Sequence, residues 1–263
     1  ASYNPAIAGL NLNFNRVRLA WEKTGQSLQA GLHAHAARSS PPVAAITLTL
    51  EPDDCACPAF AHRLDAEGQE HWHVRRSLLR RTGAVWLPVR QPDRYAGEVF
   101  ALAAAEAGLT LPEAQETGEV RGETVAVRRG KPLVEQIGDM LRYSNNMSAE
   151  AIGLAATRLA DRDVDSLAAS AEAMNRWAAR LGGFPGLDGS FALRNHSGLS
   201  AESRVTPRRM AAFLVATHRH PRLGPLLHEV LKDHAIEAPE GGGPRPSAQA
   251  KTGTMNFTRG LAG

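Results

Sequence analysis

The sequence lacks long apolar runs and long basic runs, and it contains only two cysteines in 263 residues. Without about 18–20 consecutive apolar residues it offers no transmembrane segment, so we expect a soluble protein. Arginine pairs such as Arg75-Arg76 are short, the other basic residues are scattered among acidic ones, and the formal net charge is only +3. This pattern is typical of a solvated surface and argues against nucleic-acid binding.

The chain begins with Ala1, and no signal-peptide pattern follows. We therefore expect that an upstream segment was removed or that the sequence starts within a longer protein. Its 263 residues are enough for a sizeable core and for one or two domains. A hydrophobic content of 43% with 22% charged residues is ordinary for a globular protein.

Cys55 and Cys57 are separated by a single residue in "DDCACP". A bridge between these two would be strained, because neighbouring side chains of a strand point to opposite faces and alternate positions lie too far apart. His71 and His73 share one face of a predicted strand, and together the four side chains could ligate zinc. The spacing matches no familiar zinc motif, so we expect no metal. A zinc-binding structural module stays open as an alternative.

Apolar residues alternate along much of the first half, which predicts strands. The alternating sets are Leu10-Leu12-Phe14, Val17-Leu19-Trp21 and Ile46-Leu48-Leu50. The phase slips by one between the first two sets, which predicts a turn or bulge at Asn15-Arg16. "AVWLPV" and "GEVRGETVAVRRG" also have strand character, and one helix near 92–108 starts with Pro-Asp and closes at Gly108.

After about residue 131 the periodicity becomes helical. The predicted helices are "PLVEQIGDMLRYS", with Val134, Ile137 and Leu141 on one face; "MSAEAIGLAATRLA", with Ser148 at the N-cap and Glu150 in the first turn; "DSLAASAEAMNRWAARLGG"; and "TPRRMAAFLVATH", with Thr206 at the N-cap. "SFALR" predicts a short strand, and "APEGGGPRP" a loop before a last strand, "SAQAKTGTMNF". The chain therefore reads as α+β, with a β-rich domain over 1–131 and a mainly helical domain over 132–263.

Two Lys-Thr-Gly triplets occur in the sequence. Lys23-Thr24-Gly25 lies between two alternating segments, where Thr-Gly is explained by a hairpin turn with a solvated lysine beside it. Lys251-Thr252-Gly253 lies inside a predicted strand. A glycine there costs stability and often marks the close approach of a ligand or another backbone.

Two polar loops add to the second triplet. Ser144-Asn145-Asn146 separates two predicted helices, and "NHSGLS" at Asn195–Ser200 follows a predicted strand. Each alone would pass as a turn or cap. Ser-x-Asn between helices, followed by Lys-Thr-Gly on a strand, is part of the signature of penicillin-recognising serine enzymes.

The chain resembles the D-alanyl-D-alanine carboxypeptidase/endopeptidases, the low-molecular-mass class C penicillin-binding proteins. The resemblance runs through "NLNFNRVRLAW", "YAGEVFALAAAEAGL", "PLVEQIGDMLRYSNNMSAEAI", "HSGLS" and "AKTGT". It implies a β-lactamase/transpeptidase-like domain, partial in this chain, with an inserted β-rich domain. The family's nucleophile lies upstream in a Ser-x-x-Lys motif, and no serine here has lysine at i+3. The strands that follow Lys-Thr-Gly in the family are expected to be missing as well, so we expect a middle portion of the enzyme.

The resemblance implies acyl transfer on the D-Ala–D-Ala ends of peptidoglycan stem peptides, with β-lactams as further ligands. Ser144 would relay a proton, Asn146 would hydrogen-bond the acyl-side amide, and Lys251 would supply positive charge near Ser144 and the substrate carboxylate. The implied substrate-binding residues are Thr252 and Thr254, whose hydroxyls face that carboxylate, with the Thr254 N–H as half of an oxyanion hole, and Gly253, which lets the substrate approach the strand. The resemblance implies no cofactor and no metal, and a periplasmic or cell-envelope location.

The chain departs from the family pattern at one loop. Asn195-His196 replaces the usual Asp-Gly before Ser-Gly-Leu-Ser, and Ala201 replaces an arginine after it. Asn145, in place of the commoner Asp, occupies the free middle position of Ser-x-Asn. A non-catalytic cell-wall-binding relative without the nucleophile is the alternative to an enzyme.

Overall fold

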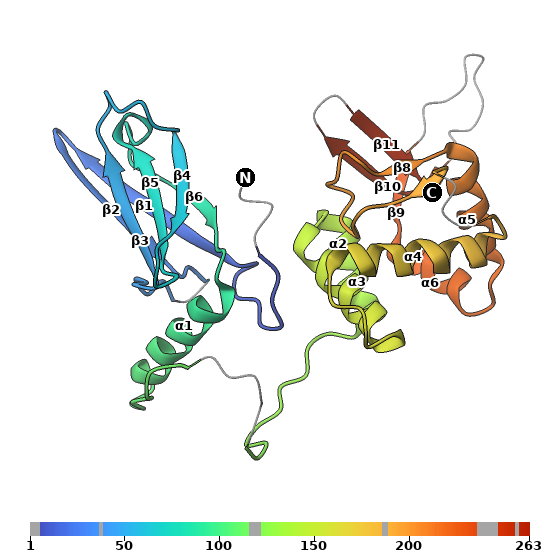
Figure 1. The fold of residues 1–263 in the computed structure, drawn as a ribbon, viewed down its shortest axis with the longest axis horizontal. Helices are drawn as coiled ribbons and strands as arrows, with labels where there is room; N and C mark the ends of the chain where they lie inside the picture. Colours follow the sequence, from blue (N-terminus) through green and yellow to red (C-terminus); the bar gives the residue numbers. More distant parts are fainter. Residues whose placement is uncertain (1–5, 37–38, 116–121, 186–188, 236–246, 256–257) are drawn as a thin grey trace. The chain divides into compact units, whose positions relative to one another are not determined.

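The computed structural model describes residues 6–263 apart from 37–38, 116–121, 186–188, 236–246 and 256–257 (Figure 1). The chain divides into two compact units, Ala1–Glu123 and Thr124–Gly263. The change of periodicity in the sequence lies slightly later, at about residue 131. The predicted loop "APEGGGPRP" lies outside the described residues.

The described residues of the first unit form two three-stranded sheets, a short 3-10 helix and one α-helix. One sheet has the order β2-β1-β6 and consists of β1 (Arg16–Thr24), β2 (Ser27–His33) and β6 (Gly83–Pro88), all antiparallel. The other has the order β3-β5-β4 and consists of β3 (Ile46–Glu51), β4 (Phe60–Leu64) and β5 (Glu70–Arg75), with β3 parallel to β5. The helices are η1 (Arg76–Leu78) and α1 (Pro92–Glu106). As predicted, Gly108 takes a left-handed conformation just after α1, with φ +84°.

Both sheets and α1 contribute side chains to one core. Val17 and Leu19 of β1 are fully buried, and so is Val74 of β5. The alternation read from the sequence places these residues on one face, since successive side chains of a strand point to opposite sides. Tyr95 of α1 is also fully buried, and its hydroxyl donates to the carbonyl of Arg16 at 3.2 Å. Burial raises the pKa of Tyr95 to about 12 because the phenolate would lose its water.

Two strand predictions are wrong, one in the first unit and one that lies mostly in the second unit. Leu10–Phe14 forms turns, because Asn13, Phe14 and Asn15 all take positive φ. The Asn15 side-chain NH₂ donates hydrogen bonds to Ala6 O and Asn11 Oδ1. Of the predicted strand "GEVRGETVAVRRG", residues 118–121 lie outside the described residues, and residues 122–130 form no strand. The side chain of Val125 is completely exposed. Alternation predicts a strand only where a neighbouring strand accepts its backbone hydrogen bonds.

Cys55 and Cys57, for which the sequence predicts only a strained bridge, form a disulfide. The argument assumed an extended chain, but the segment between β3 and β4 turns: Cys55 N donates to Pro52 O at 3.3 Å. The turn brings the two Cα atoms to 5.2 Å, inside the range that a disulfide spans. Loop geometry, which alternation does not describe, therefore decided the pairing.

In the second unit, the part of the chain that the structure describes forms five helices and several short strands. The helices are α2 (Leu133–Tyr143), α3 (Asn146–Ala160), α4 (Leu167–Gly182), α5 (Pro207–Arg219) and α6 (Leu223–Val230). The predicted cap at Thr206 is confirmed, since its side chain accepts from Arg209 N. The predicted cap at Ser148 is wrong, because α3 starts earlier and Asn145 caps it. Among the described residues, every helix is too short or too polar to cross a membrane.

The described strands of the second unit form two small sheets. A sheet of order β11-β10-β9 contains β9 (Lys232–Ala235), β10 (Ser247–Met255) and β11 (Thr258–Ala262), all antiparallel. A two-stranded ladder pairs β7 (Phe191–Ala192) with β8 (Arg204–Val205). β10 is the predicted Lys-Thr-Gly strand. β11 shows that the expectation of no strand after this triplet is wrong, since five residues suffice to pair with β10.

Candidate active site

Ser144 lies at the sharp junction between α2 and α3. It is the C-cap of α2 and takes the left-handed conformation, with φ 51° and ψ 48°. That conformation costs an L-residue about 1–2 kcal/mol, because its Cβ crowds the backbone. Glycine would relieve the strain but would remove the hydroxyl, so a serine held here is a reason to look for a function.

The two residues after Ser144 begin α3. The Asn145 side chain accepts a hydrogen bond from Ser148 N at 2.9 Å, which fixes the first turn. Asn and Asp are equally good N-caps, which explains why Asn145 can stand where the family usually has Asp. Asn146 is the first helical residue and is half-buried, two positions from Ser144. The two side chains predicted to act on substrate therefore flank one helix start.

Lys251 of β10 meets Ser144 directly. Its ammonium group donates to Ser144 Oγ at 2.5 Å, across a separation of 107 residues, and also to the carbonyl of Thr252. The structure thus brings together the lysine of the second triplet and the serine of Ser-x-Asn. The strand lysine, which the resemblance placed near Ser144, does contact Ser144 at the junction of α2 and α3.

A second contact fixes β10 against the helices. His228 of α6 shares a hydrogen bond with Gln249 Oε1 at 2.6 Å. Gln249 and Lys251 are two positions apart and therefore face the same side of the strand. α6 in turn packs against α2, whose C-cap is Ser144. α6 therefore contacts both the strand that carries Lys251 and the helix that ends at Ser144, which helps to hold the two residues together.

Partial burial makes the Lys251 proton easier to release. The pKa of Lys251 lies below its usual range because the ammonium is partly removed from water. A hydroxyl can accept one hydrogen bond and donate another. Ser144 Oγ therefore accepts from Lys251 and keeps its own proton for a third group, an arrangement suited to proton relay.

Thr252, Gly253 and Thr254 continue β10 with exposed positions. On one side this part of the strand pairs with β11, from Lys251 opposite Ala262 to Met255 opposite Thr258. On the other side β9 pairs only as far as Ala250, so in the described part of the chain no strand follows it there.

Glu150 links α3 to the Asn195–Ser200 loop. Its buried carboxylate accepts from His196 N at 3.0 Å, from Ser197 N at 3.1 Å and from Ser197 Oγ at 2.6 Å. The prediction that Glu150 lies in the first turn is wrong, because α3 starts at Asn146 and no acidic residue lies in that turn. The spacing held a signal: Glu150 is four residues after Asn146 and so lies on the same helix face.

His196, one of the departures from the family pattern, sits in a polar cluster under the loop. Its Nε2 lies 2.7 Å from Ser170 Oγ, which lies 2.5 Å from Thr157 Oγ1. Burial lowers the pKa of His196, outweighing the attraction of Glu150 for the imidazolium. The ring also packs on Gly153: a Cβ there would lie 2.2 Å from His196 Cγ.

The first triplet has no comparable surroundings. Lys23 and Thr24 end β1 and Gly25 follows in the hairpin turn, with Thr24 opposite Ser27, as predicted. Lys23 is exposed, and the triplet lies in the other compact unit.

Comparisons with known proteins give the fold and the family. The α+β class expected from sequence is confirmed by the solved structures of penicillin-binding protein 4 (dacB) from Haemophilus influenzae. A structure of this protein complexed with a β-lactam matches 97% of this chain at a TM-score of 0.67 and 17% identity. A second structure of it matches 100% of this chain at a TM-score of 0.66 and 17% identity. The chain covers 59% of the length of either relative. No curated protein sequence matches it.

A family model described as the D-Ala-D-Ala carboxypeptidase 3 (S13) family matches residues 1–263. The match covers both compact units, so it includes the Ser144 junction and β10 as well as the β-rich region. The resemblance drawn from the sequence motifs is thereby confirmed. The chain belongs to the D-Ala-D-Ala carboxypeptidase 3 (S13) family.

Proposed function

We propose that this chain is part of a serine-type D-Ala-D-Ala carboxypeptidase that cleaves peptidoglycan stem peptides and binds penicillin. The observation that carries the proposal is the 2.5 Å hydrogen bond from Lys251 to Ser144. It joins two motifs distant in sequence, at a strained helix junction. Family membership and the likeness to a penicillin-binding protein of known structure support the same conclusion.

The reaction runs through an acyl-enzyme. A serine attacks the peptide carbonyl between the two D-alanines, the terminal D-alanine leaves, and water releases the acyl group. Ser144 passes a proton between nucleophile and leaving amine, helped by the weakened hold of Lys251 on its proton. The nucleophilic serine itself is expected outside this chain, because no Ser-x-x-Lys occurs in it.

Substrate binding uses the exposed part of β10. The substrate lies along the edge of Thr252, Gly253 and Thr254, with its carboxylate near the threonine hydroxyls and Lys251. Asn146 holds the amide of the acyl side, so that the carbonyl is fixed for attack. The Thr254 N–H provides one donor of an oxyanion hole. A peptidoglycan substrate places the enzyme in the cell envelope, in the periplasm.

Intact-protein mass spectrometry tests the proposal. The complete gene product is incubated with labelled penicillin, and D-alanine release from a D-Ala–D-Ala peptide is measured in parallel. We expect one penicillin adduct per chain and release of D-alanine. An endopeptidase would also cleave cross-linked stem peptides. Binding to peptidoglycan fragments with neither adduct nor release would favour the non-catalytic cell-wall-binding alternative.

A further inference from the structure

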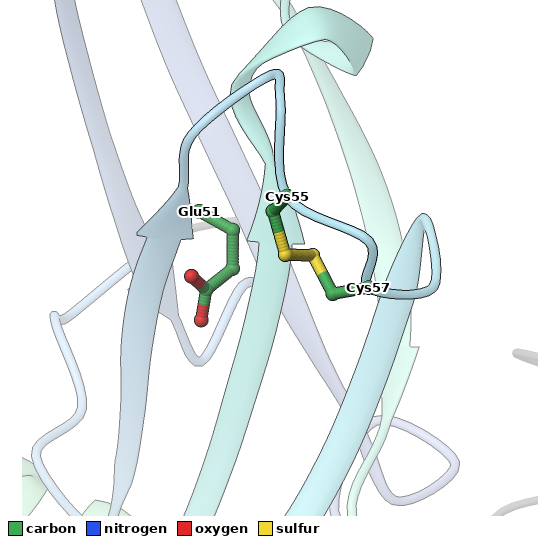
Figure 2. A group of neighbouring side chains, drawn as sticks. All are labelled: Glu51, Cys55 and Cys57. Atoms are coloured by element: carbon green, nitrogen blue, oxygen red, sulfur yellow. A yellow bond between two sulfur atoms is a disulfide. The ribbon is translucent and has the colours of Figure 1, made fainter.

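A cluster of possible metal ligands lies in the first unit, at one end of the sheet β3-β5-β4. Glu51, Cys55 and Cys57 each place a ligand atom within 4.8 Å of the other two, and all three are half-buried. Figure 2 shows the Glu51 carboxylate at the end of its strand, beside the disulfide of the following loop. Glu51 is the last residue of β3, and the loop that follows leads to β4. This loop passes the end of β5, where Arg75 N donates a hydrogen bond to Ala59 O.

The ligand types suit a borderline-soft divalent cation. Two cysteine thiolates and one carboxylate are donors that Zn²⁺ accepts, with a water in a fourth position. The folded loop already supplies most of the organisation, since the Cα atoms of the cysteines are 5.2 Å apart. While the sulfurs are bonded to each other they cannot act as thiolate ligands. Disulfide and metal therefore exclude one another.

A neighbouring histidine orients the carboxylate. His73 Nδ1 lies 2.7 Å from Glu51 Oε1, so one oxygen is held while the other stays available. Metal-binding carboxylates are usually held in this way by a hydrogen bond from a further residue. A second histidine–carboxylate pair on β5 serves as a control for His73–Glu51. His71 lies 2.8 Å from Asp65, and in the described part of the chain no cysteine lies with that pair.

We propose that reduction of Cys55–Cys57 opens a binding site for a Zn²⁺-like cation, with Cys55, Cys57 and Glu51 as ligands and His73 as a positioning residue. A dithiol reduces the disulfide by thiol exchange: the S–S bond breaks, each cysteine sulfur takes up one electron and one proton, and the dithiol becomes a disulfide. The cation then replaces the two thiol protons, which pass to water. The site is separate from the proposed peptidase function.

Cobalt binding tests this on the whole chain. The protein is reduced with a phosphine, which takes oxygen from water to become phosphine oxide, so no small thiol competes for metal. After removal of the phosphine without oxygen, Co²⁺ is titrated and the thiolate-to-cobalt charge-transfer absorption is followed. We expect one Co²⁺ per reduced chain, displaced by Zn²⁺, and no such band in the oxidised protein. Zn²⁺ should also slow re-formation of the disulfide.

Matched variants distinguish the ligands from the surroundings. Cys55→Ser should abolish the band, while Glu51→Gln and His73→Ala should weaken Co²⁺ binding about 10- to 100-fold. Asp65→Asn and His71→Ala, which alter the neighbouring pair, should bind as the wild type does. Circular dichroism of each variant checks the fold.

Three outcomes would overturn the inference. The first is a reduced wild type that binds no more Co²⁺ than the oxidised one, and the second is wild-type affinity in Glu51→Gln. The third is an equal loss in His71→Ala and His73→Ala. Binding by other histidines, such as the pair His218–His228 on α5 and α6, gives no thiolate band and persists in Cys55→Ser.

Discussion

Lys23-Thr24-Gly25 closes the hairpin between β1 and β2, whereas Lys251-Thr252-Gly253 lies inside β10. Lys23 is exposed beside its turn, and Lys251 is partly buried and donates to Ser144. The same tripeptide therefore serves a local turn in one unit and a contact between distant segments in the other.

The two glycines show what each triplet requires. Gly25 has a φ of +59°, in the left-handed region where glycine is favoured. Gly253 has no such angle, and a Cβ built on it meets nothing within 4 Å. The backbone explains the first glycine but not the second. A glycine that the fold does not require is what a ligand-facing strand would retain.

The largest expected effect separates the two lysines. Lys251→Ala in the complete gene product should slow acylation by penicillin ~30- to 1000-fold, corresponding to about 2–4 kcal/mol for a lost charge-assisted contact in the site. Lys23→Ala should leave the rate unchanged and alter the free energy of unfolding by no more than about 0.5 kcal/mol. Second-order acylation rates of the two variants and the wild type give the comparison. Equal rates for Lys251→Ala and wild type would falsify the assigned role.

The next effect concerns the packing behind the Ser144 junction. Gly153→Ala should destabilise the second unit by about 1–3 kcal/mol, because the new methyl group collides with the His196 ring. In a His196→Gly background the same change should instead stabilise α3 by about 0.5–1 kcal/mol, as alanine does in a helix. Hydrogen exchange of α3 peptides measures both changes. If the sign is the same in both backgrounds, His196 does not set the constraint.

A smaller effect compares the two glycines. Gly25→Ala should cost about 1–2 kcal/mol, because alanine is strained at positive φ, with no change in acylation. Gly253→Ala should leave stability unchanged and yet slow acylation, since the methyl group would project where the substrate approaches. The free energy of unfolding in urea is measured by tryptophan fluorescence for Gly25→Ala and by hydrogen exchange of β10 for Gly253→Ala. These stabilities are then compared with the acylation rates of the same variants. A fold destabilised by Gly253→Ala would give that glycine a structural explanation.

The smallest effect is a pH dependence confined to the second unit. Burial holds the pKa of His196 below its ordinary value of 6.5, so the unfolded chain takes up this proton first as the pH falls. The stabilisation by neutral His196 is complete above pH 6.5 and is lost from there down to the lowered folded pKa. The stability difference between wild type and His196→Gln should therefore shrink from about pH 8 to about pH 5. A constant difference across that range would contradict the buried, neutral ring.

Local features could be predicted where the determining interaction lies within one element. The cap at Thr206 and the left-handed Gly108 after α1 follow from a few neighbouring residues, and both are found. The inward alternation of Val17 and Leu19 depends only on the two-residue repeat of a strand. Predictions failed where alternation had no partner strand, as at 122–130, or where the chain turned, as at Cys55–Cys57.

For the candidate site, the sequence by itself determined the residue types and their order. Ser144, Asn146 and Lys251 were selected by motif, and local propensity placed them at a helix junction and on a strand. Only the tertiary structure decided that Lys251 donates to Ser144 and that Glu150 holds the Ser197 loop. The physical reason is that these contacts join segments 107 and 47 residues apart. Backbone propensity acts over a few residues, whereas such contacts form only once packing of helices and sheet has brought the segments together.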